Sequence, residues 1–215
     1  MAFRFWTRAK SLKRQALGRR SSTMYHAGNR ALQDEFASRG LADRLVQELS
    51  RSKFSDNDKQ FIEAASFFFL ATADDEGRPD CSFKGGLPGF ARVVAPDLMV
   101  FPDYDGNGMF KSLGNIAVNP HVGMLFIRVG EKPGRLRING RAEISRDDPL
   151  IAETPGAQLL VKVMPIDIFP NCPRYIPRLE LVGPSVYAPV ANAKPVEPAW
   201  KSSEVLKDVV PPRRR

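Results

Sequence analysis

The residues most suited to chemistry lie in a short glycine-bearing loop, residues 103–108, with the sequence DYDGNG. Residues 109–116 follow with the pattern of a short helix, and Lys111 and Ser112 fall within its first turn or so. Backbone N–H groups are free at a helix start and can bind a phosphate, to which a lysine and a hydroxyl add donors. Loops rich in Asp, Gly and Asn also join strands to helices in many proteins. The loop alone therefore leaves open an ordinary connection with a solvated lysine.

A second glycine-rich segment, residues 83–94, has the sequence FKGGLPGFARVV and precedes this loop. Lys84 and Arg92 flank three glycines that fall within five residues, which permits close approach of the backbone to a flat ligand, or an unusual turn. The two cations could meet the same phosphate or the electron-rich edge of such a ligand. The alternative is a flexible loop with two surface charges, and this segment alone favours neither.

Short extended segments surround both loops, each bounded by Gly, Pro or Asp. They are residues 67–73, 79–83, 91–94, 98–101, 122–129 and 135–144, and one more apolar run covers 159–168. Hairpin spacing and a single internal helix favour an antiparallel barrel over a parallel α/β sheet. We therefore predict a mainly β fold, a closed six-stranded antiparallel barrel with short helices.

The flanking segments have other patterns. Apolar residues between positions 32 and 49 recur at helical spacing, with Gly40 as the expected break between two helices, and Ser55 with Asp58 predicts a capped helix over 57–65. The chain after Phe169 is rich in proline, which favours a packed wrap or an extended tail over another domain. The predicted organisation is a basic tail (1–22), a helical arm (23–66), the barrel (67–182) and a Pro-rich extension (183–215).

The positive charge is concentrated in the two tails. Of the formal charge of +8, residues 1–22 supply +7 and residues 213–215 supply +3, which leaves −2 for the body. A near-neutral body lacks the basic face of a specific nucleic-acid binder, although the tails could make loose contacts with RNA or anionic lipid. An acid-free, Arg- and Ser-bearing leader fits either a basic flexible tail or an organelle-targeting segment.

Two cysteines, Cys81 and Cys172, are too few for a disulfide framework and indicate free thiols in a reducing compartment. No apolar run approaches the roughly 20 residues that span a bilayer, so we expect no transmembrane segment and a cytoplasmic protein. Neither of the two histidines has a neighbour at metal-ligand spacing, so no metal site is predicted.

The order of these features resembles a known family. FFFLATADDEGRPDCSFKGG, then RVVAPDLMVFPDYDGNGMFKSLGNIAVNPHVGMLF, then RLRINGRAEI are similar to the pyridoxamine 5′-phosphate oxidase-like family of split barrels that bind flavin mononucleotide (FMN). The resemblance covers roughly residues 54–144, and NCPRYI at 171–176 resembles a segment of one branch of the family. It implies an FMN-binding split β-barrel and a homodimer with FMN at the interface.

By matching position, the resemblance puts Arg92 at the family's arginine on the strand before the cofactor loop, and Lys111 and Ser112 at its phosphate-binding pair. That pair is commonly Arg-Lys, so Lys-Ser has one cation fewer, and Lys84 or Arg92 would have to compensate. The family's vitamin B6 oxidase carries an Arg-Leu-Ala-Pro element near its C-terminus, whereas this chain ends in KDVVPPRRR. We therefore do not expect pyridoxamine phosphate as the substrate.

The function implied is an FMN-dependent oxidoreductase that acts on an unidentified small molecule by hydride transfer at flavin N5. Lys84 or Arg174 would stabilise the anionic reduced flavin, and Phe101 and Tyr104 would stack near its ring unless they serve the core, as aromatics on barrel strands usually do. Asn107 completes the expected cofactor set, and no catalytic residue is identified. The alternative is a flavin- or haem-binding carrier or stress protein without turnover, because related barrels host different functions.

Overall fold

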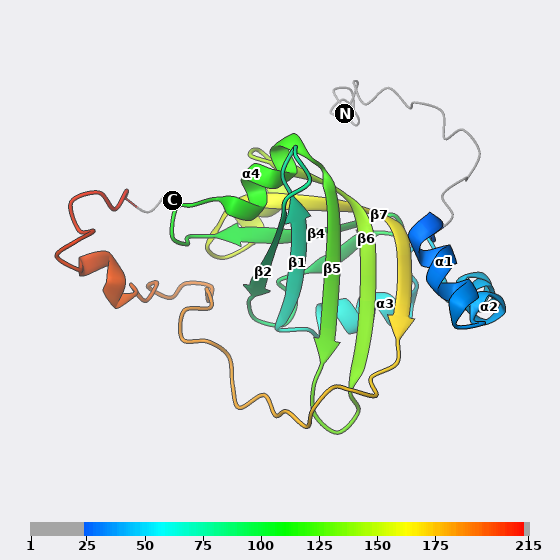
Figure 1. Ribbon diagram of the computed structural model, residues 1–215. Helices are drawn as coiled ribbons and strands as arrows, with labels where there is room; N and C mark the ends of the chain where they lie inside the picture. Colours follow the sequence, from blue (N-terminus) through cyan, green and yellow to red (C-terminus); the bar gives the residue numbers. More distant parts are fainter. Residues whose placement is uncertain (1–23, 213–215) are drawn as a thin grey trace, which may run out of the picture. The chain divides into compact units, whose positions relative to one another are not determined.

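The computed structural model describes residues 24–212, so the predicted basic tail over 1–22 lies outside the described part of the chain. The chain divides into two compact units, one up to Glu48 and one from Leu49 onward. The larger unit holds a single antiparallel sheet (Figure 1). Its strands are β1 (Phe67–Ala73), β2 (Pro79–Gly85), β3 (Arg92–Ala95), β4 (Leu98–Tyr104), β5 (His121–Arg128), β6 (Gly134–Ser145) and β7 (Ala157–Asn171).

The strand order is β2-β1-β5-β6-β7-β4-β3, and every pairing is antiparallel. The mainly β antiparallel class predicted from the sequence is confirmed, with two corrections. The sheet has seven strands, because the apolar run at 159–168 is itself the strand β7 and pairs with both β6 and β4. The sheet is also not closed, since β2 and β3 are its two edges and are not hydrogen-bonded to each other.

Strand alternation builds the core. Successive side chains of a strand point to opposite faces, and in β1 Phe68, Leu70 and Thr72 are buried while their neighbours are more exposed. The ring of Phe68 lies 5.0 Å from that of Phe101 and 4.8 Å from that of Phe126, centroid to centroid. These ring contacts pack β4 against β1 across the core, although the two strands are not hydrogen-bonded to each other.

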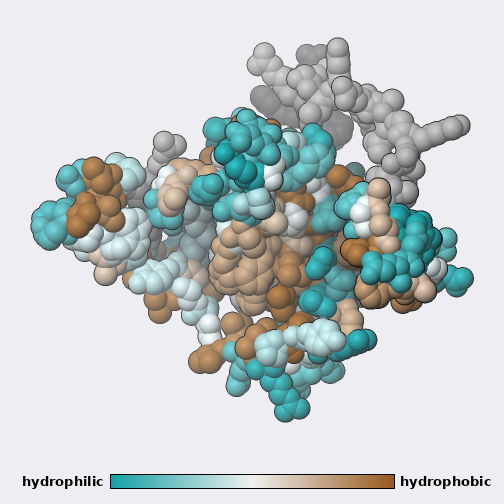
Figure 2. Space-filling view, in the orientation of Figure 1, coloured by the Kyte–Doolittle hydropathy of each residue, from teal (hydrophilic) through white to brown (hydrophobic). Residues whose placement is uncertain are grey.

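The other face of β1 and β2 carries an aromatic cluster, Phe67, Phe69 and Phe83. The rings of Phe67 and Phe83 stack at 5.3 Å, and Phe69 meets Phe83 edge-on at 5.9 Å. Phe69 is also paired across the strands with Leu125 of β5. Figure 2 shows the brown, apolar surface gathered over these strands, and Phe83 is 61% exposed. This apolar face is the largest aromatic group that the described part of the chain leaves in contact with solvent.

A bulge between Asn139 and Gly140 interrupts the long β6–β7 ladder. A Cβ atom at Gly140 would lie 2.5 Å from the carbonyl oxygen of Met164, a backbone atom that cannot swing away. Only glycine fits this close approach of two strands. The bulge therefore depends on one residue.

Three helices of this unit cover parts of the sheet: α3 (Asp56–Glu63), α4 (Lys111–Val118) and α5 (Pro149–Glu153). The predicted cap of α3 is present, because the Ser55 hydroxyl accepts from the Asp58 N–H while the Asp58 carboxylate accepts from the Ser55 N–H. α4 lies across one end of the sheet and contacts β1, β2 and β6 (Figure 1). It follows directly from the glycine-bearing loop singled out in the sequence.

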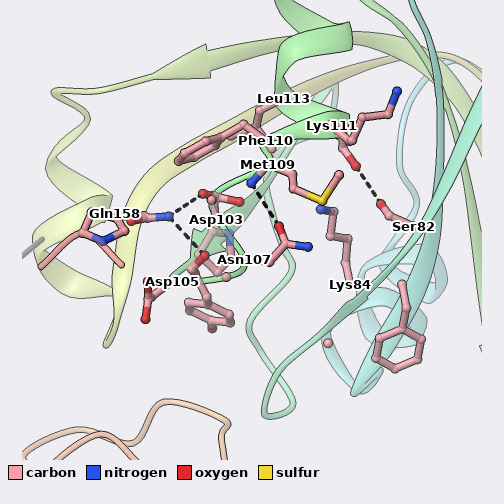
Figure 3. A pocket seen from close by; sticks show the side chains of 18 of the residues that line it. Ser82, Lys84, Asp103, Asp105, Asn107, Met109, Phe110, Lys111, Leu113 and Gln158 are labelled. Atoms are coloured by element: carbon pink, nitrogen blue, oxygen red, sulfur yellow. Dashed lines mark hydrogen bonds between the residues drawn. The ribbon is translucent and has the colours of Figure 1, made fainter. Parts of the chain in front are cut away.

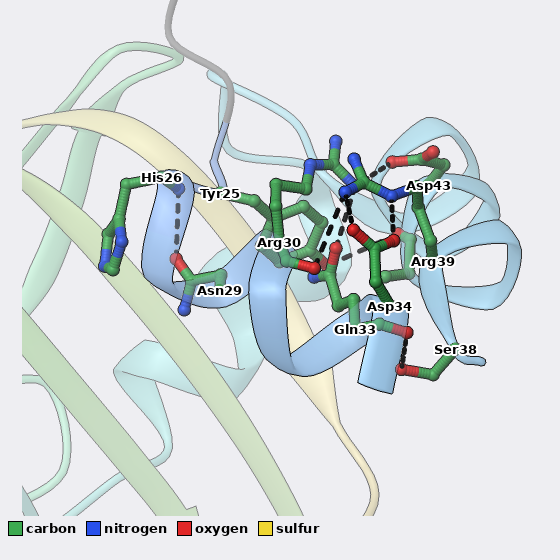
Figure 4. A network of polar contacts seen from close by, with 10 residues as sticks. Tyr25, His26, Asn29, Arg30, Gln33, Asp34, Ser38, Arg39 and Asp43 are labelled. Carbon is green, nitrogen blue, oxygen red and sulfur yellow. Dashed lines mark hydrogen bonds and ion pairs between the residues drawn. The ribbon is translucent and has the colours of Figure 1, made fainter. Parts of the chain in front are cut away.

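The smaller unit contains α1 (Ala27–Glu35) and most of α2 (Arg39–Leu49). Polar contacts join the two helices, among them an ion pair of Arg30 with Asp43 at 2.7 Å and one of Arg39 with Asp34 (Figure 4). The break between them is at Ala37, which has a positive φ of 51°, whereas Gly40 lies inside α2. The predicted break at Gly40 is therefore wrong by three residues.

From Cys172 to Pro212 the chain forms no strand, and its one helical turn is the 3-10 helix η1 (Ala199–Ser202). It is nevertheless held against the sheet. The Gly130 N–H donates to the Leu179 carbonyl at 3.0 Å, and a Cβ on Gly156 would lie 2.6 Å from the ring of Pro189. Most residues from 172 to 212 are exposed, so this C-terminal wrap is an extended chain that is attached to the rest of the unit at a few contacts.

Candidate functional site

A cavity of about 740 Å³ opens between β2, the end of β4, the loop at 105–110 and the start of α4. Its remaining wall is formed by residues of the C-terminal wrap. Figure 3 shows the polar side chains that converge on it from these elements. Its volume lies in the range of about 300–1,000 Å³ that is usual for small-molecule sites.

Alternation along β2 places Ser82 and Lys84 on the same face, toward the cavity and α4. The Ser82 hydroxyl lies 2.8 Å from the hydroxyl of Ser112, in the first turn of α4, and one of the two donates to the other. Lys84 is half-buried, and it makes no hydrogen bond or ion pair with any residue that the structure describes. Burial lowers the pKa of Lys84 despite the opposing charges of Asp103 and Asp80. The cavity therefore holds a cation that lacks a direct partner.

The turn into α4 uses unusual backbone geometry. Gly108 has φ of +75° and Phe110, at the N-cap position, has φ of +49°. The side-chain oxygen of Asn107 accepts from the Met109 N–H at 3.0 Å, which shapes the loop, but no side chain caps the helix itself. The first N–H groups of a helix have no intrahelical partner, so they are available to an anion at this end of the cavity.

Acidic residues lie at the opposite side of the loop. The Gln158 amide donates both to a carboxylate oxygen of Asp103, at 2.9 Å, and to the Tyr104 carbonyl, at 3.1 Å. Burial raises the pKa of the Asp103 carboxyl and also that of the Tyr104 hydroxyl. Asp105 forms an ion pair with Lys201 of the C-terminal wrap.

Five of the eight residues predicted from the sequence line this cavity: Lys84, Tyr104, Asn107, Lys111 and Ser112. These residues differ in their exposure to solvent. Ser112 is buried and engaged with Ser82, whereas Lys111 is exposed and extends away from Asp103 in Figure 3.

Phe101, Arg92 and Arg174 do not line the cavity of this single chain. Phe101 is fully buried in the core. Arg92 donates to the Thr154 hydroxyl at 2.8 Å, and its Nε is buried without a partner among the described residues. Arg174 is exposed and lies over the ring of Tyr175. Their predicted roles at a cofactor stay predictions.

Sequence reasoning missed several lining residues. Ser82 was detectable only in part, because it lies two positions before Lys84 and shares its face on β2, but the predicted strand 79–83 stops one residue short of Lys84. Asp103 begins the predicted loop, but nothing in the sequence distinguished its carboxylate as a site residue. Gln158 and Lys201 carry no local signal, since only tertiary folding brings them to the cavity.

Within residues 24–212 no group of three or more metal-ligating side chains could hold a metal ion. No helix in this described range is both long and apolar enough to cross a membrane.

Comparison with protein families finds one match, the model of pyridoxamine 5′-phosphate oxidase, over residues 54–166. No curated protein matches the chain significantly. Among solved structures, Group A Streptococcus HupZ is 18% identical, with 54% of this chain and 93% of HupZ covered at a TM-score of 0.44. An FMN-binding protein from Syntrophomonas wolfei is 11% identical, with 66% and 96% covered at 0.41. HutZ, the haem storage protein from Vibrio cholerae, is 20% identical, with 53% and 90% covered at 0.39.

Proposed function

The chain belongs to the pyridoxamine 5′-phosphate oxidase family, and from this membership we propose that it binds FMN and acts as an oxidoreductase on a small molecule. Both cysteines are free, which supports a reducing compartment, and we propose the cytoplasm. An organelle remains the alternative that the basic leader sequence supports.

The observation that carries the proposal is the half-buried, unpartnered Lys84 ammonium in the cavity. A charge taken partly out of water without a partner is costly, and a bound anion would remove that cost. A flavin offers two such groups, its phosphate and the electron-rich edge of its pyrimidine ring. Lys84 therefore fits FMN better than it fits a neutral ligand.

The uncapped start of α4 supports the phosphate end of the site. Its free N–H groups and the positive end of the helix dipole favour an anion. One hydroxyl of the Ser82–Ser112 pair donates to the other, so the hydrogen of the accepting hydroxyl is free to donate to a ligand. Ser82 is the more exposed of the two, and we propose that it donates to the phosphate with Ser112 behind it. Lys111 would add charge from the rim.

When bound, FMN would supply hydride transfer at N5, and the protein would supply orientation and electrostatics. Lys84 would stabilise the negative charge of the reduced ring. Tyr104 and Asn107 line the same wall and would shape the pocket. The part of the chain that the structure describes offers no evident nucleophile and base pair, which suits redox chemistry that needs none.

We also propose a homodimer with FMN at its interface. Phe67, Phe69 and Phe83 form one apolar face of β1 and β2, and Phe83 also lines the cavity, so the face and the cavity meet along β2. A second copy on this face would remove an exposed aromatic surface from water. Arg92 and Arg174, which do not line the cavity of one chain, keep their proposed roles toward the cofactor in that assembly.

The decisive experiment is the visible absorption spectrum of the purified protein, with mass spectrometry of the ligand released on denaturation. We expect a flavin spectrum and the mass of FMN, or stoichiometric uptake of added FMN. Lys84→Met should weaken FMN binding by about tenfold to a hundredfold, the scale of about 1.5–3 kcal/mol for a hydrogen bond to a charged group. Lys53→Met, an exposed lysine outside the cavity, is the control. A colourless protein that ignores FMN would overturn the proposal.

Reduction of the bound flavin separates an enzyme from a carrier. If the protein is an oxidoreductase, NADH or NADPH should bleach the flavin and oxygen should restore it. Stoichiometric flavin that neither nucleotide reduces would favour the binding protein without turnover or a different electron donor. A haem spectrum in place of a flavin spectrum would identify the haem-binding alternative.

A further inference from the structure

One end of the cavity is built by a segment that lies about a hundred residues from the cofactor loop in sequence. We call residues 198–212 the C-terminal segment. Trp200, Lys201, Leu206, Val209 and Val210 all line the cavity together with residues of β4 and the loop that follows. We call the part of this single cavity that the C-terminal segment lines the second compartment.

An ion pair fixes this segment in place. The Lys201 ammonium pairs with the carboxylate of Asp105, on the cofactor loop, and lies 3.5 Å from the carboxylate of Glu197. The Lys201 side chain is only 13% exposed. Upstream, the ring of Pro189 fills the space above Gly156, next to β7. The C-terminal segment is thus held by the ion pair of Lys201, and the chain before it is held by the contact of Pro189.

The wall presents apolar side chains to an open space. Trp200, Leu206 and Val209 line the cavity, yet they are 40%, 39% and 69% exposed. Apolar surface that faces a cavity and still contacts water gains free energy when an apolar ligand covers it. The body of the ligand that suits this compartment is therefore apolar, and the indole of Trp200 suits a ring.

The whole cavity is lined by three aspartates and three lysines, and two of the aspartates lie at the polar side of the compartment. Asp103 and Asp105 both line it, and Lys201 is the one cation of the C-terminal segment that pairs there. One oxygen of the Asp103 carboxylate accepts from the Gln158 amide, while the other accepts no hydrogen bond from any described residue. Burial raises the pKa of Asp103 more than the hydrogen bond from Gln158 and the charge of Lys84 lower it. Lys84 is the nearest alternative cation, and in the proposed function it serves the anionic cofactor.

From this charge and surface we infer that the compartment is the substrate subsite and takes an organic amine, with an apolar ring against Trp200 and a cationic nitrogen at Asp103. The inference rests on the proposed function in assigning Lys84 to FMN. A protonated amine would donate to the Asp103 oxygen that accepts no hydrogen bond. Its charge would balance the Asp103 carboxylate, because Lys201 already pairs with Asp105. The C-terminal segment would then determine specificity.

The test uses three probes with one ring and different charges: tryptamine, tryptophol and indole-3-propionate. Isothermal titration of the full-length, FMN-loaded protein should show tryptamine binding at least about fivefold more tightly than tryptophol, with the acid weakest. Asp103→Asn should bring the ratio of amine to alcohol close to one. Asp97→Asn, a change at an exposed aspartate outside the cavity, should leave the ratio unchanged.

A chain that ends at Glu197 should keep FMN binding and lose tryptamine binding, and Val209→Asp gives a second way to damage the wall if that shortened chain does not fold. Equal affinity for the three probes, or no binding of any, would overturn the subsite. FMN titration of the same proteins separates this result from failure of the proposed function. If the unaltered protein takes up no FMN, the proposed function fails, whereas FMN uptake with equal affinity for the three probes overturns the subsite alone.

Discussion

At the scale of single residues, the ion pair of Arg51 with Asp58 contains the most buried charged side chain among the described ion pairs. Asp58 is 3% exposed, caps α3, and accepts from both the Arg51 guanidinium and Ser55. Arg51 also exchanges backbone hydrogen bonds with Ile168 of β7. One residue pair therefore holds α3, the segment before it and the longest strand together.

We predict that Arg51→Gln destabilises the protein by about 2 kcal/mol at neutral pH, because it leaves a buried carboxylate without its cation. Burial alone would raise the pKa of Asp58, but the hydrogen bonds from Arg51 and Ser55 outweigh it and lower the pKa below 3.8. The stabilisation is therefore present above pH 3.8 and is lost as the pH falls through the lowered value. Urea unfolding at several pH values measures it.

Lys59→Gln is the matched control, because Lys59 makes an exposed pair with Glu63 at 3.9 Å. Exposed pairs of this kind contribute about 0–1 kcal/mol. A loss from Arg51→Gln no larger than that of the control, or one that does not shrink in acid, would contradict the role given to the buried pair.

Residue by residue, the sequence predicted the cavity in part. Lys84 and Arg92 flank the same glycine segment, yet only Lys84 lines the cavity. Lys84 follows Ser82 on β2 at strand spacing, so its direction is determined by the register with β1. Arg92 begins β3 after a turn, and its side chain goes to Thr154 in a contact between residues 62 positions apart. Sequence spacing alone contains no information about such a contact.

At the scale of elements, the bulge in the β6–β7 ladder should depend on Gly140. We predict that Gly140→Ala destabilises the protein by about 1–3 kcal/mol, the usual range for overpacking, since the new Cβ would lie 2.5 Å from the Met164 carbonyl oxygen. Gly123→Ala is the control on the neighbouring strand β5, where the nearest atoms would lie 3.7 Å away. Thermal unfolding of both variants measures the difference. Equal melting temperatures for the two would mean that the ladder adjusts at little cost.

The elements themselves were largely predictable. Short extended runs between turn residues predicted six of the seven strands, because a half-buried strand needs that pattern, whereas residues 159–168 were noted only as an apolar run. The errors arise where contacts between distant segments determine where an element begins or ends. The run at 159–168 extends in the structure to Ala157–Asn171, since β7 has β6 on one side and β4 on the other. The break between α1 and α2 is at Ala37, where the sequence carries no glycine or proline to mark it.

At the scale of the whole molecule, composition was least informative about the C-terminal wrap. Its prolines predicted an extended path, but nothing periodic indicated that Lys201 would meet Asp105, 96 residues earlier. The charge count was more useful, because it separated basic tails from a near-neutral body. That body presents an apolar face, and apolar association, rather than attraction to a polyanion, is what it supports.

We predict that the protein is a dimer through the face of Phe67, Phe69 and Phe83, and that Phe83→Glu makes it monomeric. A buried glutamate without a partner would be costly at an aromatic contact, and the loss should be at least about 2 kcal/mol, the scale of an interface hot spot. Sedimentation velocity over a range of concentrations measures the dimer dissociation.

Val94→Glu, at an exposed residue of β3, controls for an added charge alone. Because the proposal puts FMN at the interface, Phe67→Glu, at a residue of the same face that does not line the cavity, should also weaken FMN uptake. If the unaltered chain sediments as a monomer at every concentration and still binds FMN, the cofactor site is complete in one chain and the interface proposal is wrong.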